Sequence, residues 1–201
     1  MTARESADMR RQSLVDATAA CLAEAGVAGT SVRKICARAG VAPSLLRHYF
    51  DGVDALIAAT YGEVTARVAN TLEEAVAAAG PEPRERLVAF LTASFRPPIA
   101  DPSLLATWLA FWSLVKTNGA IADIHRATYA GYRADLEDLL RACGTAAEET
   151  APVAIALTAL VDGLWLELSL DPTTFTPEQA SVLAIRWLDA LLSPPRSGEG
   201  N

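Results

Sequence analysis

Residues 35–50 read ICARAGVAPSLLRHYF, and this stretch decides the fold of the N-terminal part of the chain. Apolar residues recur at helical spacing before Gly40 and again after Pro43. Glycine readily adopts the left-handed conformation that ends a helix, and proline fits the first turn of a new one. The stretch therefore predicts two short helices joined by a tight turn.

The sequence before this pair extends it to a three-helix unit over residues 8–50. A first helix is predicted over about residues 8–25, where Gly26 ends it, and Thr30 or Ser31 can cap the second helix. In a helix-turn-helix, the second helix of the pair enters the major groove of DNA while the first crosses the backbone. The pattern fits such a unit, and ordinary helical hairpins share it.

The charge of the chain is divided unevenly. The formal net charge is -7, yet residues 1–50 carry seven basic and four acidic side chains, whereas residues 51–201 carry ten and twenty. The N-terminal segment is therefore net positive on an acidic body. This distribution is compatible with DNA binding through one end of the molecule, and chance asymmetry is the alternative.

The remaining sequence keeps helical periodicity almost throughout, and strand-like alternation is nearly absent. We expect an all-α fold of about nine helices. A long fourth helix at 51–79 is predicted to link the N-terminal DNA-binding domain to a helical ligand-binding and dimerisation domain at 80–193. The Pro-, Gly- and Ser-rich residues 194–201 are predicted to form a disordered tail.

The composition disfavours several classes of protein. The three cysteines are far apart, the two histidines have no metal-ligand spacing, and no Ser/His/Asp arrangement or phosphate-binding glycine loop is visible. We therefore expect no enzyme, no metal and no cofactor. Neither a run of 18 apolar residues nor a signal-peptide core occurs, so we expect no membrane span and a cytoplasmic protein.

The segment TSVRKICARAGVAPSLLRHYFDGVDAL (30–56) resembles the N-terminal signature of the TetR family of bacterial transcriptional regulators. The segments WLAFWSLV (108–115) and ALVDGLWLELSL (159–170) resemble the C-terminal half of the BetI-like branch of that family. The N-terminal resemblance is carried by the following residues: Thr30, Val32, Ile35, Ala39, Gly40, Val41, His48, Tyr49, Phe50 and Leu56.

The resemblance implies a DNA-binding head, a body that binds a small-molecule effector, and a homodimer formed through the eighth and ninth helices. VAIALTALVDGLWLELSL (153–170) and SVLAIRWLDALL (181–192) are apolar on more than one face, which is typical of helices at a subunit interface. A two-fold dimer places its recognition helices one DNA turn apart, ~34–36 Å, on a near-palindromic operator.

Eight residues are predicted to contact double-stranded DNA: Ser31, Arg33, Pro43, Ser44, Leu45, Arg47, His48 and Tyr49. The family often places a lysine three residues after the position of Phe50, where it meets a phosphate, and this sequence has Val53 there. We expect Arg47 to supply the phosphate contact that Val53 cannot.

The aromatic side chains of the body form either a large core or an effector pocket. A pocket of aromatic rings with a carboxylate can hold a quaternary ammonium through cation–π contacts, and a neutral effector is the alternative. The predicted pocket residues are Trp108, Phe111, Trp112, Tyr129, Tyr132, Asp162 and Trp165. The sequence therefore predicts a ligand-responsive, homodimeric transcriptional repressor. The competing hypothesis is a helical adaptor protein that has lost sequence-specific DNA binding.

Overall fold

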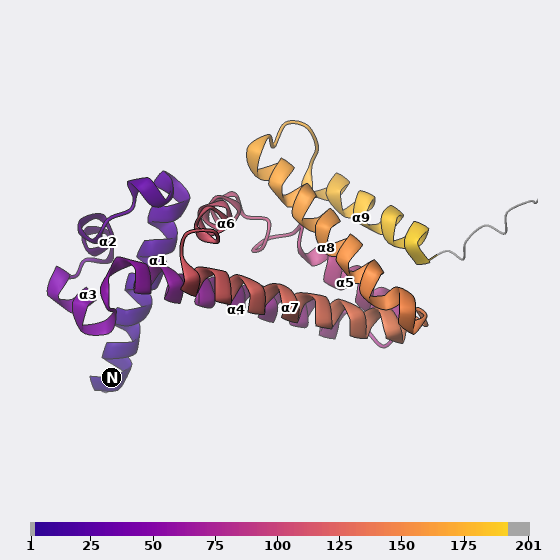
Figure 1. The fold of residues 1–201 in the computed structure, drawn as a ribbon, viewed down its shortest axis with the longest axis horizontal. Coiled ribbons are helices and arrows are strands. Elements are labelled where there is room, and N and C mark those ends of the chain that lie inside the picture. Colours follow the sequence, from indigo (N-terminus) through magenta and orange to yellow (C-terminus); the bar gives the residue numbers. More distant parts are fainter. Residues whose placement is uncertain (1–2, 193–201) are drawn as a thin grey trace, which may run out of the picture. The chain divides into compact units, whose positions relative to one another are not determined.

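The computed structural model describes the backbone of residues 3–192 and the side chains of residues 7–192. These residues form nine α-helices and no strand, which confirms the predicted all-α fold (Figure 1). The predicted disordered tail at 194–201 lies outside the described residues. The helices are α1 (Ala3–Gly29), α2 (Val32–Ala39), α3 (Pro43–Tyr49), α4 (Gly52–Ala78), α5 (Pro83–Ala93), α6 (Pro102–Leu114), α7 (Gly119–Ala142), α8 (Ala147–Leu170) and α9 (Pro177–Leu192).

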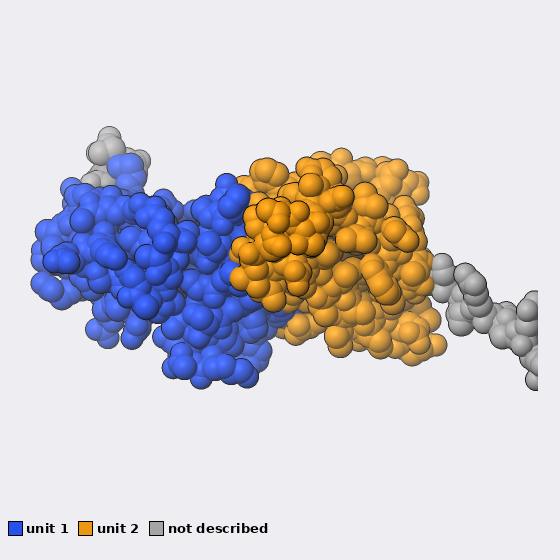
Figure 2. Space-filling view, turned by 90° about the horizontal axis from the view of Figure 1, so that it is seen from above, with its two compact units in different colours: residues 1–70, 101–129 blue, residues 71–100, 130–201 orange. Residues whose placement is uncertain are grey.

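The described residues fall in two compact units, which Figure 2 colours separately. The first unit holds the residues up to 70 together with 101–129, and the second holds 71–100 with the residues from 130 onward. Helix α6 and the first part of α7 are therefore grouped with the three N-terminal helices. The domain boundaries expected from the sequence stay a prediction.

Local sequence signals set the boundaries of the first three helices. Gly26 interrupts α1 with a φ of 60°, and Ser31 caps α2 by accepting a hydrogen bond from the Lys34 amide (3.4 Å). Gly40 ends α2 in the left-handed conformation with a φ of 66°, and Pro43 begins α3. The tight turn predicted between the two short helices is therefore formed as expected.

One apolar cluster holds α1, α2, α3 and the start of α4 together. Its buried members come from all four helices, so the head has a core of its own. Val53 and Tyr49 are half-buried and pack against this cluster. The buried residues are Leu14, Val15, Ala17, Cys21, Ile35, Cys36, Leu46, Phe50 and Leu56.

Helix α6 joins the same unit through contacts with α1 and α4. The Thr107 hydroxyl donates a hydrogen bond to the carbonyl oxygen of Ala19 (3.2 Å). The ring of Phe111 stacks on that of Tyr61, with centroids 4.4 Å apart, and both side chains are fully buried. These contacts tie the first helix of the head to an aromatic core.

The second unit is built around α8, which packs on α9, while α5 also packs on α9. The Trp165 indole donates a hydrogen bond to the carbonyl oxygen of Ser94 (2.7 Å), and Arg84 on α5 pairs with Asp189 on α9 (2.5 Å).

Among the described helices, α8 alone is long and apolar enough to cross a membrane by length and composition. Eight of its residues are nevertheless buried within this unit, as in a core helix, so this is weak evidence for a span.

Candidate nucleic-acid interface

The face of α3 that points away from the head core is exposed and carries most of the predicted DNA contacts. Pro43, Ser44, Arg47 and His48 are exposed, whereas Leu46 is completely buried. This division follows from the short length of α3, about two turns, because residues on one side of it must fill the core. The exposed face is therefore available to a major groove.

Tyr49 and Ser31, two of the predicted DNA-contact residues, have a second role in the head. Leu45 and Tyr49 are half-buried, and Tyr49 packs against the apolar cluster while its ring meets His48 edge to face, with centroids 5.1 Å apart. Ser31 is exposed, and its hydroxyl oxygen already accepts the capping bond at the start of α2. A hydroxyl that accepts one bond can still donate its proton to a phosphate oxygen.

The basic side chains of α2 and α3 divide into two groups. Lys34 donates to the carbonyl oxygen of Gly29 (2.7 Å), and Arg38 pairs with Glu24 (2.6 Å), so both are held within the head. Arg33 and Arg47 are exposed and form no ion pair with any residue that the structure describes. Arg33 and Arg47 therefore keep their charges without a described ion-pair partner, whereas Arg38 is paired and Lys34 is held by a neutral carbonyl.

The positive charge of Arg47 acts on Cys36, a residue of the head core. Burial raises the pKa of the Cys36 thiol, and the positive charge of Arg47 partly opposes this rise. Cys36 is a buried member of the apolar cluster on α2. The Arg47 side chain is therefore exposed, and its charge still acts on the Cys36 thiol.

A charged residue that the sequence analysis did not assign lies at the end of α3. The guanidinium of Arg11 lies over the ring of Phe50, 5.4 Å from its centroid. Phe50 caps α3, and Val53 three residues later is half-buried against the core and cannot reach a phosphate. The basic pair Arg10-Arg11 was visible in the sequence, but nothing in its spacing pointed to Phe50.

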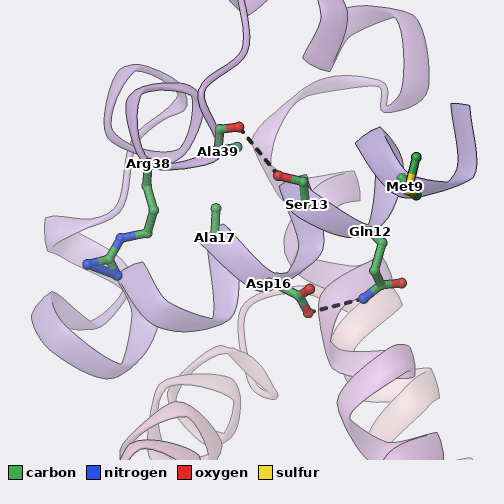
Figure 3. A pocket seen from close by; sticks show the side chains of 7 residues that line it. All are labelled: Met9, Gln12, Ser13, Asp16, Ala17, Arg38 and Ala39. Atoms are coloured by element: carbon green, nitrogen blue, oxygen red, sulfur yellow. Dashed lines mark hydrogen bonds between the residues drawn. The ribbon is translucent and has the colours of Figure 1, made fainter. Parts of the chain in front are cut away.

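A separate groove of about 500 Å³ lies between α1 and the end of α2 (Figure 3). Across it, the Ser13 hydroxyl donates to the carbonyl oxygen of Ala39 (3.4 Å). None of the eight predicted DNA-contact residues lines the groove, so it is distinct from the exposed face of α3. The lining residues are Met9, Gln12, Ser13, Asp16, Ala17, Arg38 and Ala39.

The seven residues of the predicted effector pocket are distributed over both units. Trp108, Phe111, Trp112 and Tyr129 belong to the first unit, where the first two are buried against Tyr61. The Tyr61 hydroxyl lies 3.1 Å from Nδ1 of His125, whose ring meets that of Tyr129. The buried indole nitrogen of Trp112 has no hydrogen-bond partner among the described residues.

The second unit contains the other three predicted pocket residues. The hydroxyl of Tyr132 is buried without a hydrogen-bond partner among the described residues, and its ring lies against Phe90 with centroids 5.0 Å apart. Burial raises the pKa of Tyr132, the neighbouring Ser94 side chain partly opposes this rise, and the negative charge of Asp162 adds to it. Asp162 is half-buried, and Trp165 is buried on the same helix. Within the described residues, no group of three or more His, Cys, Asp or Glu side chains is placed to hold a metal.

Comparison with known proteins places this arrangement in a family. Residues 14–60 match the family described as bacterial regulatory proteins, tetR family, and residues 83–193 match the C-terminal part of BetI-type transcriptional repressors. The chain belongs to the TetR family. The HTH-type transcriptional regulator BetI of Burkholderia thailandensis is 33% identical over 188 residues, which cover 93% of this chain and 95% of that protein. The chain is therefore a DNA-binding transcriptional regulator with a TetR-type head, and these relatives are regulators rather than enzymes.

Solved structures of transcriptional regulators share the fold along nearly the whole chain. A putative transcriptional regulator from Pseudomonas aeruginosa PAO1 is 46% identical, with a TM-score of 0.84 over 92% of this chain and 90% of that one. A putative regulator from Saccharomonospora viridis, solved in complex with choline, is 16% identical, with a TM-score of 0.78 over 90% of this chain and 96% of that one. The second likeness shows the fold alone.

Proposed function

We propose that this TetR-family regulator is a cytoplasmic homodimeric repressor without catalytic activity, released from a near-palindromic operator by a small-molecule effector. One observation supports the formation of a dimer. The described residues expose six large hydrophobic side chains, and all but Met9 lie on α8 and α9. An exposed apolar patch of this kind is typical of a subunit interface. The five residues are Ile155, Leu166, Leu170, Val182 and Trp187.

The DNA contacts in this proposal come from the exposed face of α3 and the start of α2. Arg47 and Arg33 supply charge to phosphates or to guanine edges, while Pro43 and Leu45 offer apolar contact to thymine methyl groups. Ser31, Ser44 and His48 can donate hydrogen bonds to phosphate oxygens. The exposure of these side chains and the absence of a described ion-pair partner for the two arginines support the assignment.

Replacing Arg47 with alanine tests the proposed contact between the head and DNA. We expect operator affinity to fall by about 1–3 kcal/mol, because one charged contact per protomer is lost. The slope of log affinity against log salt should become shallower by about 2, since each lost phosphate contact removes about 0.9 and a dimer loses two. Fluorescence anisotropy at several salt concentrations, on a duplex selected from random DNA by the wild type, measures both quantities.

The matched control for Arg47 is Arg86→Ala, an exposed arginine on α5 that the proposal gives no DNA role. Its salt slope should equal that of the wild type. If Arg47→Ala keeps both affinity and slope, another residue contacts that phosphate. If the wild type selects no sequence and shows no salt-dependent binding, the adaptor hypothesis replaces the repressor.

We further propose that the effector is a small cation such as choline, bound by the second unit. The buried Tyr132 hydroxyl lies near Ser94, and the carboxylate of Asp162 acts on it. The Phe90 ring lies against Tyr132, and the Trp165 indole donates to the carbonyl oxygen of Ser94. A quaternary ammonium fits a set of aromatic faces with one carboxylate. The choline bound to the Saccharomonospora viridis regulator makes this cation the first to try.

A thermal-shift measurement compares choline with its uncharged isostere 3,3-dimethylbutan-1-ol. Choline at a hundred times its dissociation constant should stabilise the protein by about 2.7 kcal/mol, which raises Tm by about 5–10 °C. Asp162→Asn should abolish the shift, whereas Glu167→Gln, an exposed carboxylate on the same helix, should keep it. An equal response to the uncharged isostere would show that the site selects shape and not charge.

A further inference from the structure

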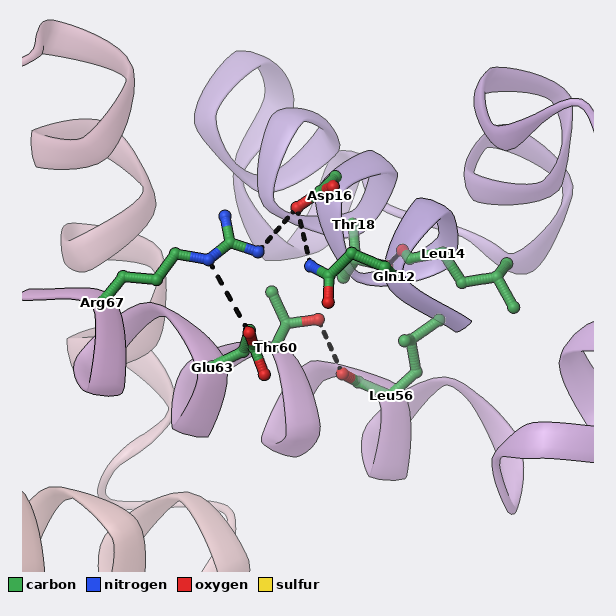
Figure 4. A network of polar contacts seen from close by, with 8 residues as sticks. All are labelled: Gln12, Leu14, Asp16, Thr18, Leu56, Thr60, Glu63 and Arg67. Carbon is green, nitrogen blue, oxygen red and sulfur yellow. Dashed lines mark hydrogen bonds and ion pairs between the residues drawn. The ribbon is translucent and has the colours of Figure 1, made fainter. Parts of the chain in front are cut away.

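An ion pair joins α4 to the first helix of the head at the edge of the head core, since Asp16 lies between the core residues Val15 and Ala17. Nη2 of Arg67 on α4 donates to Oδ1 of Asp16 on α1 at 2.8 Å, across 51 residues of sequence (Figure 4). Both residues belong to the first unit. The pair is therefore a direct link, within one compact unit, between the helix that follows the recognition helix and the helix that supports it.

Both partners of this ion pair are held in place by neighbours on their own helices. Gln12 donates a hydrogen bond to the same Asp16 oxygen (3.1 Å), and the Glu63 carboxylate lies 3.8 Å from Nε of Arg67 (Figure 4). A guanidinium and a carboxylate that are already oriented lose less side-chain entropy when they pair. The geometry therefore favours one defined separation of the two helices at this point.

On α4, Arg67 lies well beyond the residues that are buried in the apolar cluster of the head. Leu56 is the last residue of α4 in the apolar cluster of the head, and Arg67 lies eleven residues further on. At 1.5 Å per residue this is about 16 Å along the helix axis. Tyr61 and Val64 are buried between these two points, so the ion pair adds a polar contact at the end of a packed stretch and helps to hold α4 against α1.

We propose that Arg67 is a positioning residue for DNA recognition. By holding Asp16, it fixes the angle between α4 and the head, and that angle sets the half-site spacing which the two recognition helices of a dimer accept. Asp16 also lines the open groove of Figure 3. The inference rests on the proposed dimeric repressor and adds to it the residue pair that determines its choice of operator.

A positioning role can be separated from a structural one because the pair is exposed. The side chains of Arg67 and Asp16 are 51% and 53% exposed, and exposed ion pairs add little to folding stability. We therefore expect Arg67→Ala to lower Tm by no more than about 2 °C. Loss of the ion pair should change the choice of spacing while the fold and the dimer persist.

The test uses duplexes derived from the sequence that the full-length wild type selects from random DNA. In these duplexes the half-sites are moved one or two base pairs closer together or further apart, and anisotropy gives an affinity for each. The ratio of the best to the neighbouring spacing should fall about 5- to 10-fold in Arg67→Ala. Arg84→Ala, which breaks a similarly exposed pair between α5 and α9, should keep the ratio. The charge-exchanged variant Asp16→Arg with Arg67→Glu should restore most of it.

The outcomes separate this inference from the proposed function. A wild type that shows no preference among the spacings overturns the dimeric repressor itself. A wild-type preference that Arg67→Ala retains within about twofold overturns only the positioning role. A uniform loss of affinity at every spacing, together with a Tm lowered by more than about 5 °C, would make Arg67 a structural residue and also overturn it.

Discussion

Replacing Trp187 with aspartate is expected to convert the dimer into a monomer and to remove high-affinity operator binding. Trp187 is 55% exposed on α9, among the apolar residues that the proposed interface covers. Buried tryptophans in interfaces often contribute about 2 kcal/mol or more each. A two-fold interface contains each substitution twice, so the dimer dissociation constant should rise by at least about a thousandfold.

Two measurements follow the Trp187→Asp variant through this change. Light scattering coupled to size exclusion gives its mass at micromolar concentration, and anisotropy gives its affinity for the selected duplex. Operator affinity should fall towards that of a single head, because both half-sites can no longer be engaged by one particle. The free energy of unfolding of the monomer should change little, since Trp187 is already exposed in the single chain.

The matched control for Trp187 is Met9→Asp. Outside α8 and α9, Met9 is the one large hydrophobic residue that the described chain exposes to a similar extent, at 51%, and it lies on α1. This variant should remain a dimer, because the proposed interface does not include the head. A Trp187→Asp variant that is still dimeric and still binds would place the interface elsewhere and leave the exposed face of α8 and α9 for another partner.

The helices and their ends could be predicted from the sequence because local chemistry determines them. Gly40 takes the left-handed conformation, Pro43 begins α3, and Asp101 caps α6 by accepting from the Ser103 amide (2.8 Å). Each of these signals acts within four residues of the bond that it controls. The exposed apolar faces of α8 and α9 were visible for a related reason, since a helix with one buried stripe does not need apolar residues all round.

The links between distant segments could not be predicted from the sequence. The pair between Arg67 and Asp16, and the contact of Arg11 with Phe50, depend on how helices cross, which helical periodicity does not encode. The aromatic residues of the body illustrate the same limit. Phe111 is fully buried, whereas the Tyr132 hydroxyl is buried without a described partner, and both appear in the sequence only as aromatic residues in apolar helices.

Replacing the neighbouring leucines of α3 with alanine should affect different properties, stability for Leu46 and sequence preference for Leu45. Leu46 is completely buried in the head cluster, so Leu46→Ala leaves a cavity and should lower the free energy of unfolding by about 2–5 kcal/mol. Total stabilities of domains are only about 5–15 kcal/mol, so this is a large fraction. Urea denaturation measures the loss, and operator affinity should fall for every sequence alike, because part of the population no longer has a folded head.

Leu45→Ala is the matched control, since Leu45 is half-buried and is not a member of the head cluster. It should cost less than about 1 kcal/mol of stability and change sequence preference instead. If Leu45 contacts a thymine methyl group, replacing that thymine by deoxyuridine weakens binding of the wild type and leaves binding of Leu45→Ala unchanged. A wild type that is indifferent to deoxyuridine at every position has no such contact, and the exposed part of Leu45 then serves only to pack the edge of the head.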